Sequence, residues 1–201
     1  MDKYKVIKTI GQSLYGKIVM ASIGDQFVVI KECEKGLFEN KRNFKNNPTN
    51  DDIYEEIRIL KYLKNQYPLY ANNKSESNII DLYETIETPT QHNMIIEYMD
   101  FDLYEYYIER KRYRYGSFNE TMSILRQICS GLKYIHSLGI IHNDLSLENV
   151  LLKKNGSNIS VKICDFGLSY SMNSMNSMTS MQNLNESTSK KIGKITELEL
   201  S

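Results

Sequence analysis

The sequence lacks an excess of charge of either sign, a long apolar run and a secretory signal. Twenty-five Lys and Arg residues balance 25 Asp and Glu residues, so nothing global favours a nucleic acid or a membrane surface as partner. No run approaches the ~20 apolar residues that a membrane-spanning helix needs, and residues 1–8 are charged throughout. The composition of the 201 residues, 41% hydrophobic and 25% charged, is typical of a packed soluble domain.

Cysteine is also scarce. Cys33, Cys129 and Cys164 stand far apart, each inside an apolar stretch. An odd number of cysteines without a signal sequence indicates reduced thiols, so we expect an intracellular protein, cytoplasmic or nuclear. We predict that all three are buried and act as small hydrophobic side chains.

Short β-branched and apolar segments separated by turn residues predict an antiparallel arrangement in the first third of the chain. A glycine-rich turn and the pair Gly24-Asp25 separate the first three of these segments. The strands are expected at residues 4–10, 17–21, 26–31, 79–85 and 93–98.

Helical spacing of apolar residues predicts two helices. The first carries Ile53, Ile57 and Leu60, and either Asp51 or Asp52 can cap it. The polar stretches on either side, residues 38–52 and 64–78, are expected to be loops.

The second helix, over residues 118–137, starts with the capping-box spacing of Ser117 and Glu120. Its predicted buried stripe is Met122, Leu125, Ile128, Cys129, Leu132 and Ile135. The Ser/Asn/Met-rich tail that begins at residue 171 is predicted to be disordered.

Three motifs in the first third could handle phosphates. Gly11, Ser13 and Gly16 form a glycine-rich turn whose backbone N–H groups can approach phosphates, although an ordinary tight hairpin would look the same. Lys31 ends a strand and could reach the α- and β-phosphates. Glu56 could pair with Lys31 from the helix, and the adjacent Glu55 competes for that role.

Two further motifs carry metal ligands and a base. In His142-Asn143-Asp144, followed five positions later by Asn149, the Asp144 carboxylate can accept a proton and the Asn149 amide oxygen can bind a metal. Asp165 opens Asp165-Phe166-Gly167 just past a predicted strand, where a carboxylate can bridge a divalent ion to phosphates.

With all five motifs present in order, residues 4–170 resemble the protein kinase family. The resemblance implies an α+β, two-lobed kinase-like fold, with about five antiparallel strands and one helix in the N-terminal lobe and a partial helical C-terminal lobe. It implies ATP and Mg²⁺ as cofactors and a protein Ser or Thr hydroxyl as acceptor. The expected divisions are an N-lobe at residues 1–98, a hinge and partial C-lobe at 99–170, and a tail at 171–201.

The resemblance also assigns roles to residues. Asp144, Lys31 and Glu56 would be catalytic, and Asn149 and Asp165 would hold Mg²⁺. The residues from 97 to 103 resemble the hinge, with Ile96 as gatekeeper. The expected nucleotide contacts are Ile10, Gly11, Ser13, Gly16, Ile18, Val29, Lys31, Ile96, Glu97, Met99 and Leu151. The spacing of Glu56, Leu60 and Leu63, with Asp102-Leu103 beyond the hinge, is most similar to the cyclin-dependent-type branch.

The sequence departs from the family pattern at several positions. Val29 replaces the usual alanine, which should narrow the adenine slot. Asn143 replaces an arginine that receives an activation-loop phosphate, so control by that route is not expected. Ser146 replaces a lysine that contacts the transferred phosphate, and losing such a group costs about 10²–10³ in rate. We expect His142 to be structural.

The last departure is that the chain stops where the family continues into Ala-Pro-Glu and further helices. Three interpretations remain open: a working or partner-completed kinase, a non-catalytic ATP-binding pseudokinase or regulatory module, and a truncated fragment. The expected partners are a protein substrate and a regulatory protein, with no nucleic acid and no membrane.

Overall fold

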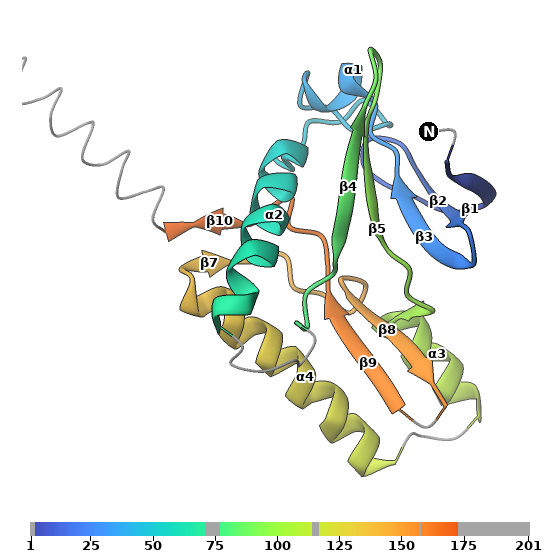
Figure 1. The fold of residues 1–201 in the computed structure, drawn as a ribbon, viewed down its shortest axis with the longest axis vertical. Coiled ribbons are helices and arrows are strands. Elements are labelled where there is room, and N and C mark those ends of the chain that lie inside the picture. Colours follow the sequence, from blue (N-terminus) through green and yellow to red (C-terminus); the bar gives the residue numbers. More distant parts are fainter. Residues whose placement is uncertain (1–2, 71–76, 114–116, 157, 173–201) are drawn as a thin grey trace, which may run out of the picture.

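The structure is a computed structural model that describes residues 3–70, 77–113, 117–156 and 158–172. A five-stranded antiparallel sheet forms the first lobe, in the order β1-β2-β3-β5-β4 (Figure 1). The strands predicted from the sequence are present, with bounds shifted by a few residues. They are β1 (Lys5–Gln12), β2 (Lys17–Ile23), β3 (Gln26–Lys31), β4 (Leu82–Glu87) and β5 (His92–Glu97).

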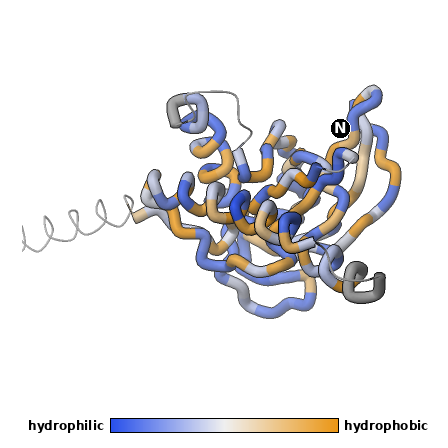
Figure 2. The backbone as a smooth tube through the Cα atoms, turned by 90° about the horizontal axis from the view of Figure 1, so that it is seen from below, coloured by the Kyte–Doolittle hydropathy of each residue, from blue (hydrophilic) through white to orange (hydrophobic). Residues whose placement is uncertain are grey.

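Apolar side chains cover both faces of the central strands of this sheet. Val19, Ala21, Val28, Ile30 and Ile95 form one buried cluster, and their neighbours Val29 and Met94, which point to the other face, are buried as well. Figure 2 shows hydrophobic and hydrophilic stretches mixed along the backbone. The edge strand β1 is exposed along its whole length.

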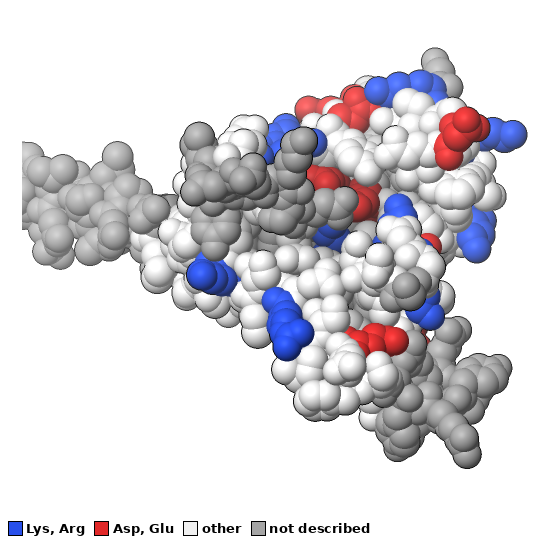
Figure 3. Space-filling model, turned by 60° about the horizontal axis from the view of Figure 1, so that its bottom comes forward, with Lys and Arg blue, Asp and Glu red and all other residues white. Residues whose placement is uncertain are grey.

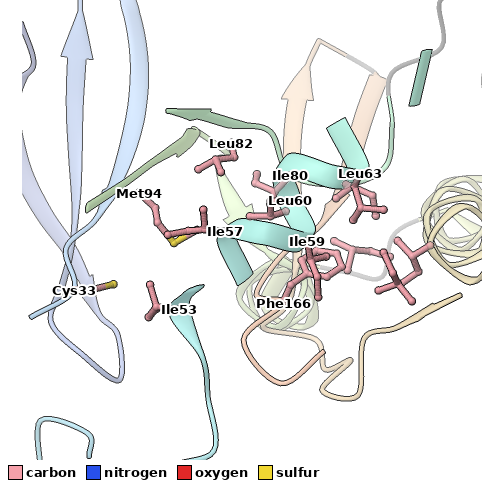
Figure 4. Packing of buried hydrophobic residues seen from close by; sticks show 14 of the residues in the cluster. Cys33, Ile53, Ile57, Ile59, Leu60, Leu63, Ile80, Leu82, Met94 and Phe166 are labelled. Carbon is pink, nitrogen blue, oxygen red and sulfur yellow. The ribbon is translucent and has the colours of Figure 1, made fainter. Parts of the chain in front are cut away.

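Helix α2 (Ile53–Tyr70) packs on the other face of the sheet. Figure 4 shows Ile57 and Leu60 lying beside Leu82 and Met94 of the sheet. The Asp52 carboxylate accepts hydrogen bonds from the backbone N–H groups of residues 54 and 55, at 3.0 and 3.2 Å, so Asp52 is the capping residue of the two candidates.

The loop predicted over residues 64–78 is partly wrong, because α2 continues to residue 70. Its added turns contact the second lobe, where the ring of Tyr67 packs edge-on against Tyr134 with 5.1 Å between ring centroids. Tertiary packing therefore extends the helix through a polar stretch. A short helix, α1 (Lys35–Phe38), lies between β3 and α2.

The second lobe packs helices against small sheets. A cluster of Tyr106, Ile124, Val150, Leu152 and Val161 forms its core. The sheets pair β6-β8-β9 and β7-β10. The elements are β6 (Phe101–Asp102), α3 (Leu103–Tyr113), α4 (Phe118–Ser137), β7 (Ile140–Ile141), β8 (Val150–Asn155), β9 (Asn158–Ile163) and β10 (Tyr170–Ser171).

Helix α4 begins as predicted, since the Ser117 hydroxyl accepts a hydrogen bond from the Glu120 backbone N–H at 3.2 Å. The predicted buried stripe is partly wrong. Ile124, Gly131, Tyr134 and Ile135 are buried, whereas Leu125 is 47% exposed.

Gly131 explains which face of α4 turns inward. A β-carbon there would lie 2.9 Å from the Asn78 carbonyl oxygen and from Ile163, so the absence of a side chain lets α4 approach β9 closely.

The predicted burial of all three cysteines is corrected at one position. Cys129 is exposed because it lies on the outer side of α4, while Cys33 is buried. Cys164 is partly buried, and burial raises the pKa of its thiol well above the ordinary value.

Within the described part of the chain, no helix combines the length and apolar character needed to cross a membrane. The tail predicted to be disordered lies outside the described residues from position 173 onward.

Candidate active site

A cleft of about 760 Å³ lies between the five-stranded sheet and the second lobe. This volume is in the range of pockets that hold small ligands. Most residues predicted to bind nucleotide or metal line it. They are Ile10, Gly11, Ser13, Ile18, Val29, Lys31, Glu56, Ile96, Glu97, Met99, Asn149, Leu151 and Asp165.

Lys31 and Glu56 form a buried ion pair in this cleft. The Lys31 ammonium donates a hydrogen bond to Glu56 Oε2 at 2.7 Å, and both side chains are largely buried. The competing candidate, Glu55, instead pairs with Arg58 on the outside of α2. The structure therefore selects Glu56 of the two carboxylates.

Burial and charge act against each other on this pair. Burial alone would lower the pKa of Lys31, but the carboxylates of Glu56 and Asp165 outweigh it and hold that pKa well above its ordinary value. Burial raises the pKa of Glu56 to about 7, against the opposing effect of Lys31. Lys31 thus remains a cation in the cleft.

Asp165 brings a third group to the ion pair. Its Oδ1 lies 3.4 Å from the Lys31 ammonium, and this positive charge lowers the pKa of the Asp165 carboxyl. The backbone of Asp165 has φ = +64°, a left-handed conformation that Asp tolerates better than most side chains. The carboxylate is consequently ionised and aimed at the cleft.

The loop after β7 places Asn149 opposite these groups. Its amide nitrogen donates to the Asp144 carbonyl oxygen at 2.8 Å and to Asp144 Oδ2 at 3.2 Å. The amide oxygen of Asn149 is left to accept, and with the Asp165 carboxylate it offers the oxygen ligands that Mg²⁺ prefers. The donor set fits a Mg²⁺ ion.

His142 has the structural position expected for it. Its Nε2 lies 2.9 Å from the Cys164 carbonyl oxygen, its Nδ1 accepts from the Asp144 backbone N–H, and its ring contacts Phe166. Burial lowers the pKa of His142, so the ring is neutral and holds the Asp165 turn against the loop that carries Asp144.

Asn143 also has a structural reason to be Asn. Its φ is +64°, and its amide nitrogen donates to the Leu168 carbonyl oxygen at 3.4 Å. Asn is among the residues that adopt this backbone region most readily. The position therefore ties the loop to the segment after Asp165.

Two predicted residues do not line the cleft. A β-carbon at Gly16 would lie 2.3 Å from the Glu32 carbonyl oxygen, so this glycine permits close contact with the end of β3. Asp144 is hydrogen-bonded to Asn149, which does line the cleft.

Sequence reasoning missed several residues that line the cleft, among them Tyr15, Phe44 and Asp51. The Asp51 carboxylate is buried, its Oδ1 has no hydrogen-bond partner, and burial raises its pKa to about 6. Phe44 and Asp51 lie in a polar segment without periodicity, so no pattern marked them as cleft residues.

Comparison with known proteins decides the family. A family model described as the protein kinase domain matches residues 4–186. The chain belongs to the protein kinase family. The matched range includes all five motifs.

The relatives are longer kinases. NUAK family SNF1-like kinase 1 of Homo sapiens is 33% identical over 170 residues, which cover 83% of this chain and 22% of that protein. SNF1-like protein kinase ssp2 of Schizosaccharomyces pombe is 33% identical over 171 residues, 84% of this chain and 26% of that protein. A probable myosin light chain kinase of Dictyostelium discoideum is 32% identical over 163 residues, which cover 76% of this chain and 45% of that protein.

The chain thus spans from about a fifth to less than half of the length of these relatives. Their names do not test the cyclin-dependent-type branch, which stays a prediction.

Proposed function

We propose that the chain is a protein serine/threonine kinase that transfers the γ-phosphoryl group of ATP to a Ser or Thr hydroxyl of a protein substrate. The observation that carries this proposal is the buried pair of Lys31 and Glu56 with Asp165 3.4 Å from the same ammonium, inside a ligand-sized cleft. Kinase relatives of this chain support the reaction class.

Each group has a role that its surroundings allow. Lys31, held by Glu56, binds the α- and β-phosphates, and Asp144 accepts the proton of the attacking hydroxyl. Asn149 and Asp165 would hold Mg²⁺, and the ion would supply positive charge against the phosphates. Ile10, Val29, Met99 and Leu151 supply apolar walls for the adenine ring.

The proposed partners are protein substrates and a regulatory protein, inside the cell. Figure 3 shows one face of the molecule on which acidic and basic side chains are interspersed, without a broad patch of one sign.

The test is phosphoryl transfer from labelled ATP to a generic protein substrate by the purified chain. The comparison is with Asp144→Asn, and Asp25→Asn, an exposed turn carboxylate, is the matched control. Losing the base should lower the rate by about 10²–10⁴, and label should appear on phosphoserine or phosphothreonine.

Label on tyrosine would refute the acceptor class. ATP binding with no transfer that depends on Asp144 would favour a pseudokinase instead.

A further inference from the structure

The connection between β3 and α2, residues 34–51, folds over the tip of the glycine-rich turn. Three hydrogen bonds spread along this connection reach the two tip residues, Leu14 and Tyr15. The Glu34 N–H donates to the Tyr15 carbonyl oxygen at 2.9 Å, and the Phe44 N–H donates to the Leu14 carbonyl oxygen at 2.8 Å. The Tyr15 hydroxyl donates to the Asp51 carbonyl oxygen at 2.6 Å.

The connection has a built structure of its own. The Asn43 side-chain oxygen accepts hydrogen bonds from the N–H groups of Lys45 and Asn47, both at 3.0 Å, and closes a tight turn. The Thr49 N–H donates to the Lys41 carbonyl oxygen at 3.0 Å. These bonds hold Phe44 in the position from which it reaches Leu14.

Tyr15 anchors the tip from the inside. Its side chain is 1% exposed and packs edge-on against Phe38, with 5.9 Å between ring centroids. Burial raises the pKa of Tyr15 to about 12, so the hydroxyl keeps the proton that it donates. Backbone N–H groups of a glycine-rich turn bind phosphate more tightly when they are already held in place, so fixing the tip should raise the affinity for the ligand.

We propose that residues 34–51 act as a clamp that preorganises the glycine-rich turn for phosphate, with Tyr15 as its main positioning residue. Leu14, Tyr15 and Phe44 all line the same cleft as Lys31 and Asp165, and Leu14 and Tyr15 belong to the turn that is expected to contact the phosphates. The inference rests on the proposed function, because it takes the ligand of this cleft to be ATP.

The test removes one hydroxyl. Tyr15→Phe keeps the ring and deletes the bond to Asp51. Tyr134→Phe is the matched control, because the Tyr134 hydroxyl is also buried and also donates to a backbone carbonyl oxygen, that of Leu63. The dissociation constants of Mg-ATP and of adenosine are measured by calorimetry for the wild type and both variants.

The clamp predicts that Tyr15→Phe weakens Mg-ATP binding by about two- to tenfold, the range for one hydrogen bond. Adenosine, which has no phosphates, should bind equally well, and Tyr134→Phe should leave the ratio of the two constants unchanged. Equal or tighter Mg-ATP binding by Tyr15→Phe would overturn the proposal, as would an equal loss for adenosine.

Amide hydrogen exchange on the ligand-free chain tests the clamp even if no nucleotide binds. The Glu34 and Phe44 amides should be protected in the wild type, and the Phe44 amide should exchange faster in Tyr15→Phe. Unprotected amides at both positions in the wild type would overturn the clamp. Absence of ATP binding with these amides protected would instead count against the proposed function.

Discussion

Two buried lysines, Lys31 and Lys162, each lie between two carboxylates, yet they serve different regions of the molecule. Lys31 lies 2.7 Å from Glu56 and 3.4 Å from Asp165, and it lines the cleft. Lys162 of β9 lies 3.4 Å from Glu97 and 3.7 Å from Asp81, and it is outside the described lining of the cleft.

The surroundings of the two lysines explain why the Lys31 pair, unlike the Lys162 pair, can serve a ligand. Both lysines need partners, because a buried unpaired charge is costly. The partners of Lys162 lie at the end of β5 and just before β4, so this pair connects the second lobe to the sheet. Lys31 has a short bond to a helix and a longer one to Asp165, and it borders open volume that a phosphate can enter.

The largest expected effect comes from Lys31→Ala. Losing a hydrogen bond to a charged group costs about 1.5–3 kcal/mol, so the dissociation constant of Mg-ATP should rise about 10- to 100-fold. Calorimetric titration measures it. Lys162→Ala, the matched control, should change that constant by less than about threefold. Similar losses in both variants would remove the distinction between the two lysines.

Lys162→Met should have the opposite effect: it should lower the free energy of unfolding and leave the affinity for Mg-ATP nearly unchanged. The buried Glu97 carboxylate would lose its cation, at a cost of about 1–3 kcal/mol in the free energy of unfolding. Urea denaturation measures this. Adding Glu97→Gln should restore part of the loss, since the stranded charge is gone. Unchanged stability of Lys162→Met would show that the pair contributes nothing.

Asp51 lines the same cleft as Lys31, and its carboxyl makes the stability of this region depend on pH. Its pKa is about 6 when folded, above the 3.8 of an ordinary Asp, so the folded state binds the proton more tightly. The stability that Asp51 contributes is therefore present at low pH and lost as the pH rises through about 6.

Asp51→Asn should consequently raise the free energy of unfolding at pH 8, by about 1–3 kcal/mol for a buried unsatisfied group. The gain should shrink as the pH falls from 8 to 5. Thermal unfolding across this range measures it, with Asp25→Asn as an exposed control. A gain that is constant with pH would argue against titration of Asp51.

The smallest effect is expected from Glu55→Gln. Glu55 pairs with the largely exposed Arg58, and exposed pairs contribute about 0.2–1 kcal/mol. Nucleotide affinity should stay within about twofold of the wild type, whereas Glu56→Gln should weaken it. Equal losses would mean that the two neighbouring carboxylates share the role assigned to Glu56.

Much of this site was predictable from the sequence because its residues stand in short, ordered motifs. The glycine turn, Lys31, Asn149 and Asp165 each stand in such a motif, and the structure brings them to one cleft. The choice between Glu55 and Glu56 needed the structure, because periodicity does not resolve adjacent positions.

Other features escaped because they depend on tertiary contacts. Helix α3 was not predicted, and α2 runs on through a polar stretch that its contact with Tyr134 supports. The contacts of the 34–51 segment with Leu14 are made by backbone groups, which no side-chain pattern encodes. Cys129 is exposed, contrary to the prediction, because the buried face of α4 is the one that carries Gly131.

The central claim is that Lys31, Asn149 and Asp165 form one Mg-ATP site. The most direct measurement is ATP titration of the wild type and of Asp165→Asn, each with Mg²⁺ and with a chelator. The account predicts that the wild type binds ATP more tightly with Mg²⁺, and that Asp165→Asn loses most of this difference. A wild type that does not bind ATP, or an Asp165→Asn variant with the full Mg²⁺ dependence, would contradict it.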